Sequence, residues 1–357
     1  MASSLLERML KTGASNNSNA ILANSIVFDD TQQVPTSIPA LNIALSGSMK
    51  GGVGPGITLL AAPSRHFKSS LGLLCVSSYM KAHPDSVCIF YDSEFGSPKN
   101  FFTSFGIDPQ RVIHVPIENL ETFKFDIVSK LDEATRADKL IIFVDSIGNT
   151  ASKKELEDAE NEKSTTDMTR AKVLKGILRM ITPKLALKSI PFIGINHVYS
   201  ELGLYPKTIM GGGTGPLLAA QNVIFVSRAQ EKGSDGEIDG YNFTLIVEKS
   251  RLVREKMKVP LEVRYDGGIN QWSGLLDIAV ELELVIKPKQ GWYTRPCVEG
   301  DKNWRAKETN SMTFWGPIFK NTNFTECVEA MYRLPQDTGT TMQDISNISD
   351  IVGADDE

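Results

Sequence analysis

The strongest constraint on the fold is a regular alternation of short apolar runs and amphipathic stretches between residues 57 and 197. Candidate strands, each built around an apolar run, fall at 57–62, 86–92, 112–117, 139–146 and 191–197, and the stretches with helical periodicity fall at 68–81, 98–106, 121–136 and 168–187. Short runs that are apolar throughout are typical of parallel strands buried on both faces. The pattern therefore predicts an α/β fold with a mainly parallel twisted sheet covered by helices.

The part of the chain beyond residue 197 follows a different pattern. Three further candidate strands, at 222–228, 241–251 and 260–269, have hairpin-like spacing with few helical residues between them. We expect them to extend the sheet antiparallel at one edge. A smaller region, about 276–335, holds three of the four tryptophans and predicts a small C-terminal α/β unit with its own core.

The N-terminal 35 residues read as an arm outside the main domain. Leu5, Leu6, Met9 and Leu10 lie on one side of a short helix, a Ser/Asn-rich linker follows, and AILANSIVF at 20–28 is a candidate strand. Such an arm has too few residues to bury its own apolar face. It packs on the body of the chain or joins one subunit to another.

The charge distribution leaves nucleic acid open as a partner. The net charge is −5, but residues 336–357 carry six acidic residues and no Lys or Arg, so this tail outweighs the whole excess. We expect the tail to be disordered; it either keeps the protein in solution or competes with DNA for basic surface. The predicted organisation is an arm at 1–35, a core domain at 36–275, a small domain at 276–335 and an acidic tail at 336–357.

The sequence contains neither a membrane-span pattern nor a secretory signal. No stretch approaches 18 consecutive apolar residues, and the start, MASSLLERML, lacks the apolar centre of a signal peptide. We therefore expect an intracellular protein in the cytoplasm that does not contact a membrane.

Polar residues stand at or beyond the carboxyl ends of four of the predicted strands. These are Lys68-Ser69, Asp92-Ser93-Glu94, Asp145-Ser146 and Asn196-His197. Ligands of open α/β sheets bind outside the carboxyl ends of the strands, so these residues predict one site. Taken singly, Glu94 could equally be a solvated strand end and His197 a hydrogen-bonded core histidine.

The segment between the first strand and its helix predicts a phosphate-binding loop. Its candidate nucleotide contacts are Ala62, Pro63, Ser64, Arg65, His66, Phe67, Lys68, Ser69 and Ser70. Backbone N–H groups at a helix N-terminus favour an anion, Lys68 would reach the β and γ phosphates of ATP, and the Ser69 hydroxyl would hold Mg²⁺. Asp145 would complete the Mg²⁺ shell, Glu94 would polarise the attacking water, and His197 would sense the γ phosphate.

Phe67 stands where such loops usually have glycine, and Ala62 replaces the first glycine. We expect the residue before Lys68 to contribute its backbone N–H with a negative φ, which phenylalanine tolerates. Its ring needs only to point away from the phosphates. The substitution is therefore compatible with a working site.

With these residues placed, the chain resembles the RecA/Rad51 recombinase superfamily and, within it, the UvsX recombinases of T-even-type bacteriophages. The resemblance covers nearly the whole chain and rests on long motifs in the right order. They are APSRHFKSS, FYDSEFG, IIFVDSIGN, TDMTRAK, INH, MGGGTGP, VEKSR and SGLLDIAVE.

The resemblance implies a role for each matching position. Glu94 matches the catalytic glutamate, Phe101 an adenine-stacking aromatic, and His197 a polar relay where glutamine is usual in RecA-like proteins. Lys249 and Arg251 resemble basic residues that a neighbouring subunit inserts into the ATP site; alternating along one strand, they would share a face.

The resemblance also places two DNA loops, at about 151–167 and 198–216. The second suits a single strand by its own composition, because it is Gly-rich and carries aromatic and basic residues. Its candidate DNA contacts are Tyr199, Tyr205, Lys207, Gly211, Gly212 and Gly213. The first, with KKELEDAENEK, is too acidic to indicate DNA without the resemblance.

Together these features predict a DNA-dependent ATPase that forms helical filaments on single-stranded DNA and pairs it with homologous double-stranded DNA. ATP and Mg²⁺ are the expected cofactors. A phage single-strand-binding protein and a recombination mediator are the expected partners. The alternatives are a ring helicase built on the same core and a non-catalytic mediator that has lost hydrolysis.

Overall fold

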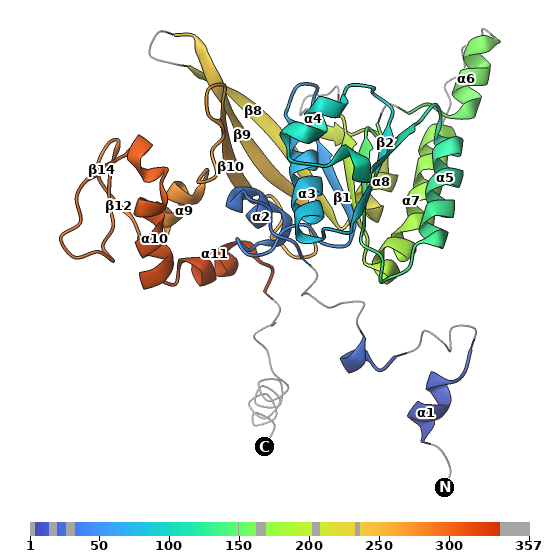
Figure 1. Ribbon diagram of the computed structural model, residues 1–357, viewed down its shortest axis with the longest axis horizontal. Helices are drawn as coiled ribbons and strands as arrows, with labels where there is room; N and C mark the ends of the chain where they lie inside the picture. Colours follow the sequence, from blue (N-terminus) through green and yellow to red (C-terminus); the bar gives the residue numbers. More distant parts are fainter. Residues whose placement is uncertain are drawn as a thin grey trace, which may run out of the picture.

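A nine-stranded sheet forms the centre of the molecule (Figure 1). The computed structural model describes residues 4–13, 20–25, 33–148, 150–161, 169–201, 208–232 and 236–335. The strand order is β11-β10-β9-β8-β1-β5-β4-β2-β3. The six strands from β8 to β3 are parallel, and β9, β10 and β11 continue the sheet antiparallel. The predicted parallel sheet and its antiparallel extension are both confirmed.

The strands lie close to the predicted ranges. They are β1 (Gly56–Ala61), β2 (Val87–Asp92), β3 (Val112–Pro116), β4 (Leu140–Asp145), β5 (Pro191–Asn196), β8 (Asn222–Lys232), β9 (Ile238–Lys249), β10 (Lys258–Arg264) and β11 (Gly268–Ile269). Every residue of β1, β4 and β5 is buried, as expected for central strands covered on both faces.

Helices cover both faces of the sheet (Figure 1). On one face, α2 (Pro39–Ser46) and α3 (Lys68–Ala82) share a core with the strands; on the other, α5 (Leu120–Glu133) and α7 (Thr169–Lys188) do. The shorter α4 (Lys99–Ser104) and α8 (Thr214–Ala219) lie near the strand ends. The sequence did not predict α2, because all its residues from Ala40 to Ser46 are buried and no polar face marks it as a helix.

The C-terminal part forms a smaller unit beside the antiparallel strands (Figure 1). Its elements are α9 (Leu275–Glu281), β12 (Ile286–Lys289), β13 (Trp292–Thr294), β14 (Trp304–Arg305), the 3₁₀ turn η6 (Ala306–Thr309), α10 (Met312–Asn321) and α11 (Phe324–Tyr332). Trp304 and Trp315 are buried, as predicted, and Trp315 stacks on Phe324. The tryptophans therefore serve mainly as core. That core is continuous with the one that α2 and α3 share with the sheet, so the expected separate core is wrong.

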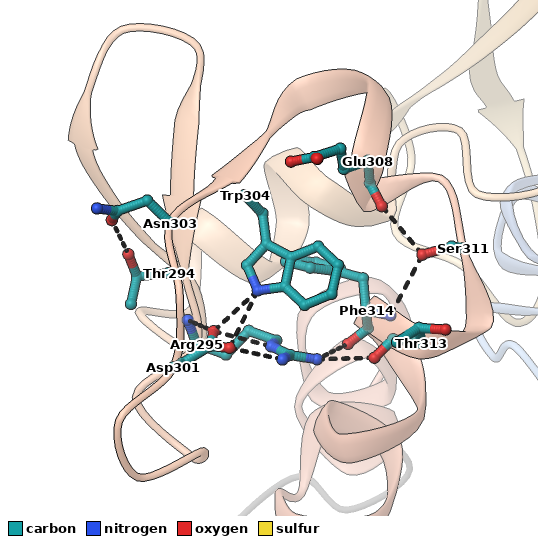
Figure 2. A network of polar contacts seen from close by, with 9 residues as sticks. All are labelled: Thr294, Arg295, Asp301, Asn303, Trp304, Glu308, Ser311, Thr313 and Phe314. Atoms are coloured by element: carbon teal, nitrogen blue, oxygen red, sulfur yellow. Dashed lines mark hydrogen bonds and ion pairs between the residues drawn. The ribbon is translucent and has the colours of Figure 1, made fainter.

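A buried polar network holds this unit together (Figure 2). Arg295 and Asp301 form a bidentate pair, with Nη2 to Oδ1 at 2.7 Å and Nε to Oδ2 at 2.9 Å. Arg295 also donates to the carbonyls of Thr313 and Phe314, so it ties the loop after β13 to the start of α10. Burial alone would raise the pKa of Asp301, but hydrogen bonds from Arg295 and Trp304 outweigh it and bring the pKa to about 2. The carboxylate therefore stays ionised at neutral pH.

The N-terminal arm contains α1 (Leu5–Leu10), begun by a capping box at Ser4, and the 3₁₀ turn η2 (Leu22–Asn24). The expected strand at 20–28 is wrong for residues 20–25, where the chain turns; residues 26–28 lie outside the described part. A strand needs a partner edge, and residues 20–25 are not hydrogen-bonded to any of the described strands.

Two further expectations concern the acidic tail and membrane-spanning helices. The acidic tail at 336–357 lies outside the described residues. Among the helices that are described, none has the length and apolar character needed to cross a bilayer.

Candidate active site

The ends of four parallel strands meet around one cavity. Ala61 of β1 is the register partner of Asn196 of β5, and Asp92 of β2 is the partner of Asp145 of β4, so the segments that follow them are neighbours. They enclose about 270 Å³. The lining residues are Ser64, Arg65, His66, Phe67, Lys68, Ser69, Ser70, Glu94, Gly96, Ser97, Phe101, Asp145, Ile195 and His197. The structure thus brings together most of the residues that the sequence pointed to.

The base of the loop differs from the expectation. Ala62 and Pro63 do not line the cavity. Ala62 is fully buried and its N–H donates to the Asn196 carbonyl at 3.3 Å, while the Pro63 carbonyl accepts a 2.8 Å hydrogen bond from Lys68 Nζ. Both residues therefore stabilise the loop through backbone hydrogen bonds rather than by lining the cavity.

Lys68 is the first residue of α3 and is 6% exposed. Burial lowers the pKa of its ammonium, and the nearby carboxylates of Glu94 and Asp145 oppose that shift. A desolvated cation beside the unpaired N–H groups of a helix N-terminus is a strong attractor for phosphate.

Phe67 adopts a left-handed backbone conformation, with φ of 63° and ψ of 13°, so the expected negative φ is wrong. This conformation costs a residue with a side chain roughly 1–2 kcal/mol, which is why glycine is usual. The Phe67 ring stacks on Phe243 of β9 with centroids 5.3 Å apart and planes at 22°. A stacked pair contributes about 0.5–1.5 kcal/mol beyond its buried area, which is comparable to the backbone cost.

Ser69 and Asp145 form the second element of the site. The Ser69 hydroxyl donates to Asp145 Oδ2 at 2.6 Å, and Asp145 Oδ1 is buried with no hydrogen-bond partner among the described residues. Burial raises the pKa of Asp145 to about 6, and the charges of Glu94 and Asp92 add to that shift. Two hard oxygen ligands, one of them unpaired, fit a Mg²⁺ ion.

Glu94 and His197 form the third element. His197 Nε2 lies 2.7 Å from Glu94 Oε1. Burial alone would raise the pKa of Glu94, but the hydrogen bond and charge of His197, with the charge of Lys68, lower it. The turn that carries Glu94 is fixed by Asp92, whose Oδ1 accepts from the N–H groups of Glu94 and Phe95.

His197 also begins a small hairpin of β6 (Val198–Ser200) and β7 (Thr208–Met210). The side chain of Asn196 donates to the Gly211 carbonyl at 2.9 Å, and the Gly211 N–H donates to the His197 carbonyl at 2.8 Å. The hairpin is therefore attached directly to the residue that contacts Glu94.

Asp92 and Asn196 support the cavity from the last positions of two buried strands, and the sequence pattern assigned them no separate role. Each is almost fully buried, at 3% and 0% exposure, and each uses its side chain to fix a backbone turn beside the cavity. The sequence signal for both residues was their position as the polar residue at the end of an otherwise apolar run.

The candidate DNA loops are only partly described. Tyr199 is 55% exposed, whereas Tyr205 and Lys207 lie outside the described residues. Gly212 and Gly213 have φ of 87° and 73° and lead into α8. Within the first loop, residues 153–160 form a helix, α6 (Lys153–Glu160), started by a capping box at Ser152.

Lys249 and Arg251 do not line the cavity of their own chain. Lys249 of β9 is paired with Val223 of β8, which is in turn paired with Leu59 of β1, so Lys249 lies two strands away from the strand that carries the phosphate-binding loop. Its Nζ donates to the carbonyls of Leu217 and Leu218 at the end of α8. β9 ends at Lys249, so the expected alternation of both cations along one strand is wrong.

Comparison with known proteins identifies the family of this chain. Residues 272–328 match the family described as "Bacteriophage T4, Recombination and repair protein, C-terminal domain". The recombination and repair protein of Enterobacteria phage T4 is 48% identical over 341 residues, which cover 93% of this chain and 86% of the relative. The chain belongs to the family of phage recombination and repair proteins.

More distant relatives connect this family to RecA. RecA of Chloroherpeton thalassium is 27% identical over 79% of this chain and 76% of its own length. RecA of Streptomyces rimosus is 25% identical over 77% and 70%. The predicted RecA-like core is confirmed, as is the assignment to recombinases, which are DNA-dependent ATPases. Nucleotide binding, DNA binding and filament formation are properties of RecA-family recombinases.

Proposed function

We propose that the chain uses ATP and Mg²⁺ to form helical filaments on single-stranded DNA and to exchange strands with homologous double-stranded DNA in the cytoplasm of a host bacterium. The observation that carries the proposal is the meeting of Lys68, the Ser69–Asp145 pair and the Glu94–His197 pair around one cavity. These groups supply a phosphate-binding cation, a metal site and a base for water.

Ser69 and Asp145 are the residues that would hold Mg²⁺, which neutralises negative charge on the phosphates when bound. Lys68 would exchange its hydrogen bond with the Pro63 carbonyl for one with a phosphate oxygen. Phe101, which lines the cavity and meets Phe105 edge to face, offers a ring to the adenine base.

Glu94 would accept a proton from the attacking water, and His197 would connect that event to DNA. In the structure His197 contacts Glu94 through its ring and the β6–β7 hairpin through its backbone. If the His197 ring exchanged Glu94 for another hydrogen-bond partner, the change would therefore be transmitted through the His197 backbone to the proposed DNA contacts. These contacts are Tyr199, Tyr205, Lys207 and Gly211–Gly213.

We further propose that the arm at 1–35 joins protomers. On α1 the side chains of Leu5, Leu6 and Met9 are exposed by 54–63%, and no residue of this helix is buried. The core at 36–275, the small domain at 276–335 and the tail at 336–357 complete the proposed organisation. A phage single-strand-binding protein and a mediator are its proposed partners.

ATP hydrolysis with and without single-stranded DNA tests this function. We expect DNA to raise the hydrolysis rate, and microscopy to show open helical filaments when ATP and DNA are both present. A rate that DNA leaves unchanged would contradict the proposal. Closed rings with strand-unwinding activity would favour a ring helicase instead.

Replacing Asp145 with asparagine should abolish Mg²⁺-dependent hydrolysis and yet stabilise the free protein. The folded-state pKa, about 6, exceeds the ordinary value of 3.8, so ionisation of Asp145 reduces stability as pH rises from about 4 to 6. At pH 7 the full cost is present, and Asp145→Asn should gain about 1–3 kcal/mol. Near pH 4 the gain should shrink.

Urea unfolding at both pH values, without nucleotide, measures this effect. Glu118→Gln, at an exposed position, is the control and should change little. If Asp145→Asn is no more stable than the unchanged chain at pH 7, the carboxylate is not destabilised by burial.

A further inference from the structure

The β8–β9 hairpin touches the phosphate-binding loop at two points. The guanidinium of Arg228 on β8 donates through Nη1 to the Arg65 carbonyl at 2.8 Å. Phe243 on β9 stacks against Phe67 with centroids 5.3 Å apart. Arg228 and Phe243 are direct partners in the antiparallel ladder, so their side chains leave the same face of the sheet.

The two contacts coincide with the two strained positions of the loop. From Ala62 to Ser70, a fully described stretch, Arg65 and Phe67 are the residues with positive φ, at 61° and 63°. Neither is glycine, the residue that adopts this conformation without a steric cost. The hairpin therefore contacts the loop at the positions where its backbone is least stable by itself.

The supporting residues are themselves held in place. The Arg228 guanidinium lies 4.6 Å from the centre of the Tyr241 ring, and Tyr241 packs against Phe243 with centroids 6.0 Å apart. Tyr265, just beyond β10, meets Tyr241 edge to face at 5.8 Å. Phe243 is only 3% exposed. The Phe243 ring is therefore buried and in contact with both Phe67 and Tyr241.

We propose that Phe243 and Arg228 are positioning residues for ATP binding. The phosphate-binding loop lacks the usual glycine, and these two residues hold it in the conformation that presents its N–H groups to phosphate. The inference rests on the proposed function, since it takes the cavity at Lys68 to be the ATP site. It adds that ATP affinity depends on side chains outside the cavity. A glycine in place of Phe67 would make the Phe243 contact unnecessary.

A double-mutant cycle between Phe67 and Phe243 tests this dependence. Phe243→Leu keeps an apolar side chain but removes the stacked ring. We expect it to weaken MgATP binding roughly three- to tenfold, the loss that corresponds to one aromatic pair, and to raise KM with kcat unchanged. In a Phe67→Gly background the same substitution should change MgATP binding less than about twofold.

The Arg228 contact provides an independent cycle. Arg228→Met keeps the apolar stem and loses the donor to the Arg65 carbonyl, so we expect weaker MgATP binding in the unchanged background. With Arg65→Gly that loss should disappear. Phe225→Leu, on β8 but packed on the opposite face of the sheet, is the matched control and should bind MgATP normally.

The outcomes separate the two proposals. Absence of MgATP binding by the unchanged chain would overturn both. Normal binding by Phe243→Leu would overturn the positioning role alone. An equal loss with Phe67 present and in the Phe67→Gly background would also overturn it, because the effect would then come from the general packing of β9. Thermal unfolding of each variant shows whether the fold is retained.

Discussion

Replacement of Lys68 with alanine should abolish ATP hydrolysis, with a fall in turnover of at least about 100-fold. Lys68 is 6% exposed, its Nζ donates to the loop carbonyl of Pro63, and the negative charges of Glu94 and Asp145 act on it. It is therefore the cation placed to contact the phosphates. No other residue of the cavity lining offers a cationic side chain at the start of α3. The measurement is phosphate release with saturating single-stranded DNA.

Lys68→Met separates the effect of losing the charge from the effect of losing side-chain volume. It keeps an apolar side chain of similar length in the buried site, and we expect the same loss of turnover. Burial lowers the pKa of Lys68, which means that the ammonium reduces stability at neutral pH; removal of the charge should leave the unfolding temperature equal or higher.

The result also tests the non-catalytic alternative. If the unchanged chain and Lys68→Ala both lack turnover while the unchanged chain binds DNA, the protein is a mediator. Retained turnover in Lys68→Ala would instead mean that the cavity is not the ATP site.

The sheet and the position of the site were predictable because burial constrains the sequence most strongly there. Strands β1, β4 and β5 are buried throughout, and the ends of β4 and β5 are marked by Asp145 and Asn196. Since parallel strands end at the same edge, the residues that follow them had to lie together. Local pattern was sufficient for this part of the fold.

Other features depend on contacts between distant segments. The positive φ of Phe67 is compensated by Phe243, which lies far along the chain on β9, and no local pattern reports that pairing. The helix α2 is buried on all sides, so it lacks the periodicity that reveals a helix. The turn at Leu22–Asn24 replaced an expected strand because a strand also requires a partner edge.

The second large effect concerns Lys249 and Arg251, which we propose act on the ATP site of a neighbouring protomer. Neither residue lines the cavity of its own chain. Burial, together with the charge of Arg251, lowers the pKa of Lys249, and the two cations lie close enough to repel each other. An anion from another subunit would relieve that repulsion. The double variant Lys249→Ala/Arg251→Ala should therefore lose nearly all DNA-dependent hydrolysis.

Mixing two inactive variants distinguishes action between subunits from action within one. Lys68→Ala has a defective site of its own but retains Lys249 and Arg251. The double variant has an intact site but lacks both cations. In a random equimolar filament about a quarter of the interfaces would combine an intact site with intact cations, so about a quarter of normal activity should return.

The matched control mixes Lys68→Ala with Glu94→Gln. Both variants then lack a residue of their own cavity, every interface contains a defective site, and hydrolysis should stay absent. If the first mixture forms filaments but recovers no more activity than this control, Lys249 and Arg251 support the fold of their own chain through the end of α8. Recovery in the first mixture alone would make assembly a condition of catalysis, and would couple ATP, filament and DNA in one equilibrium.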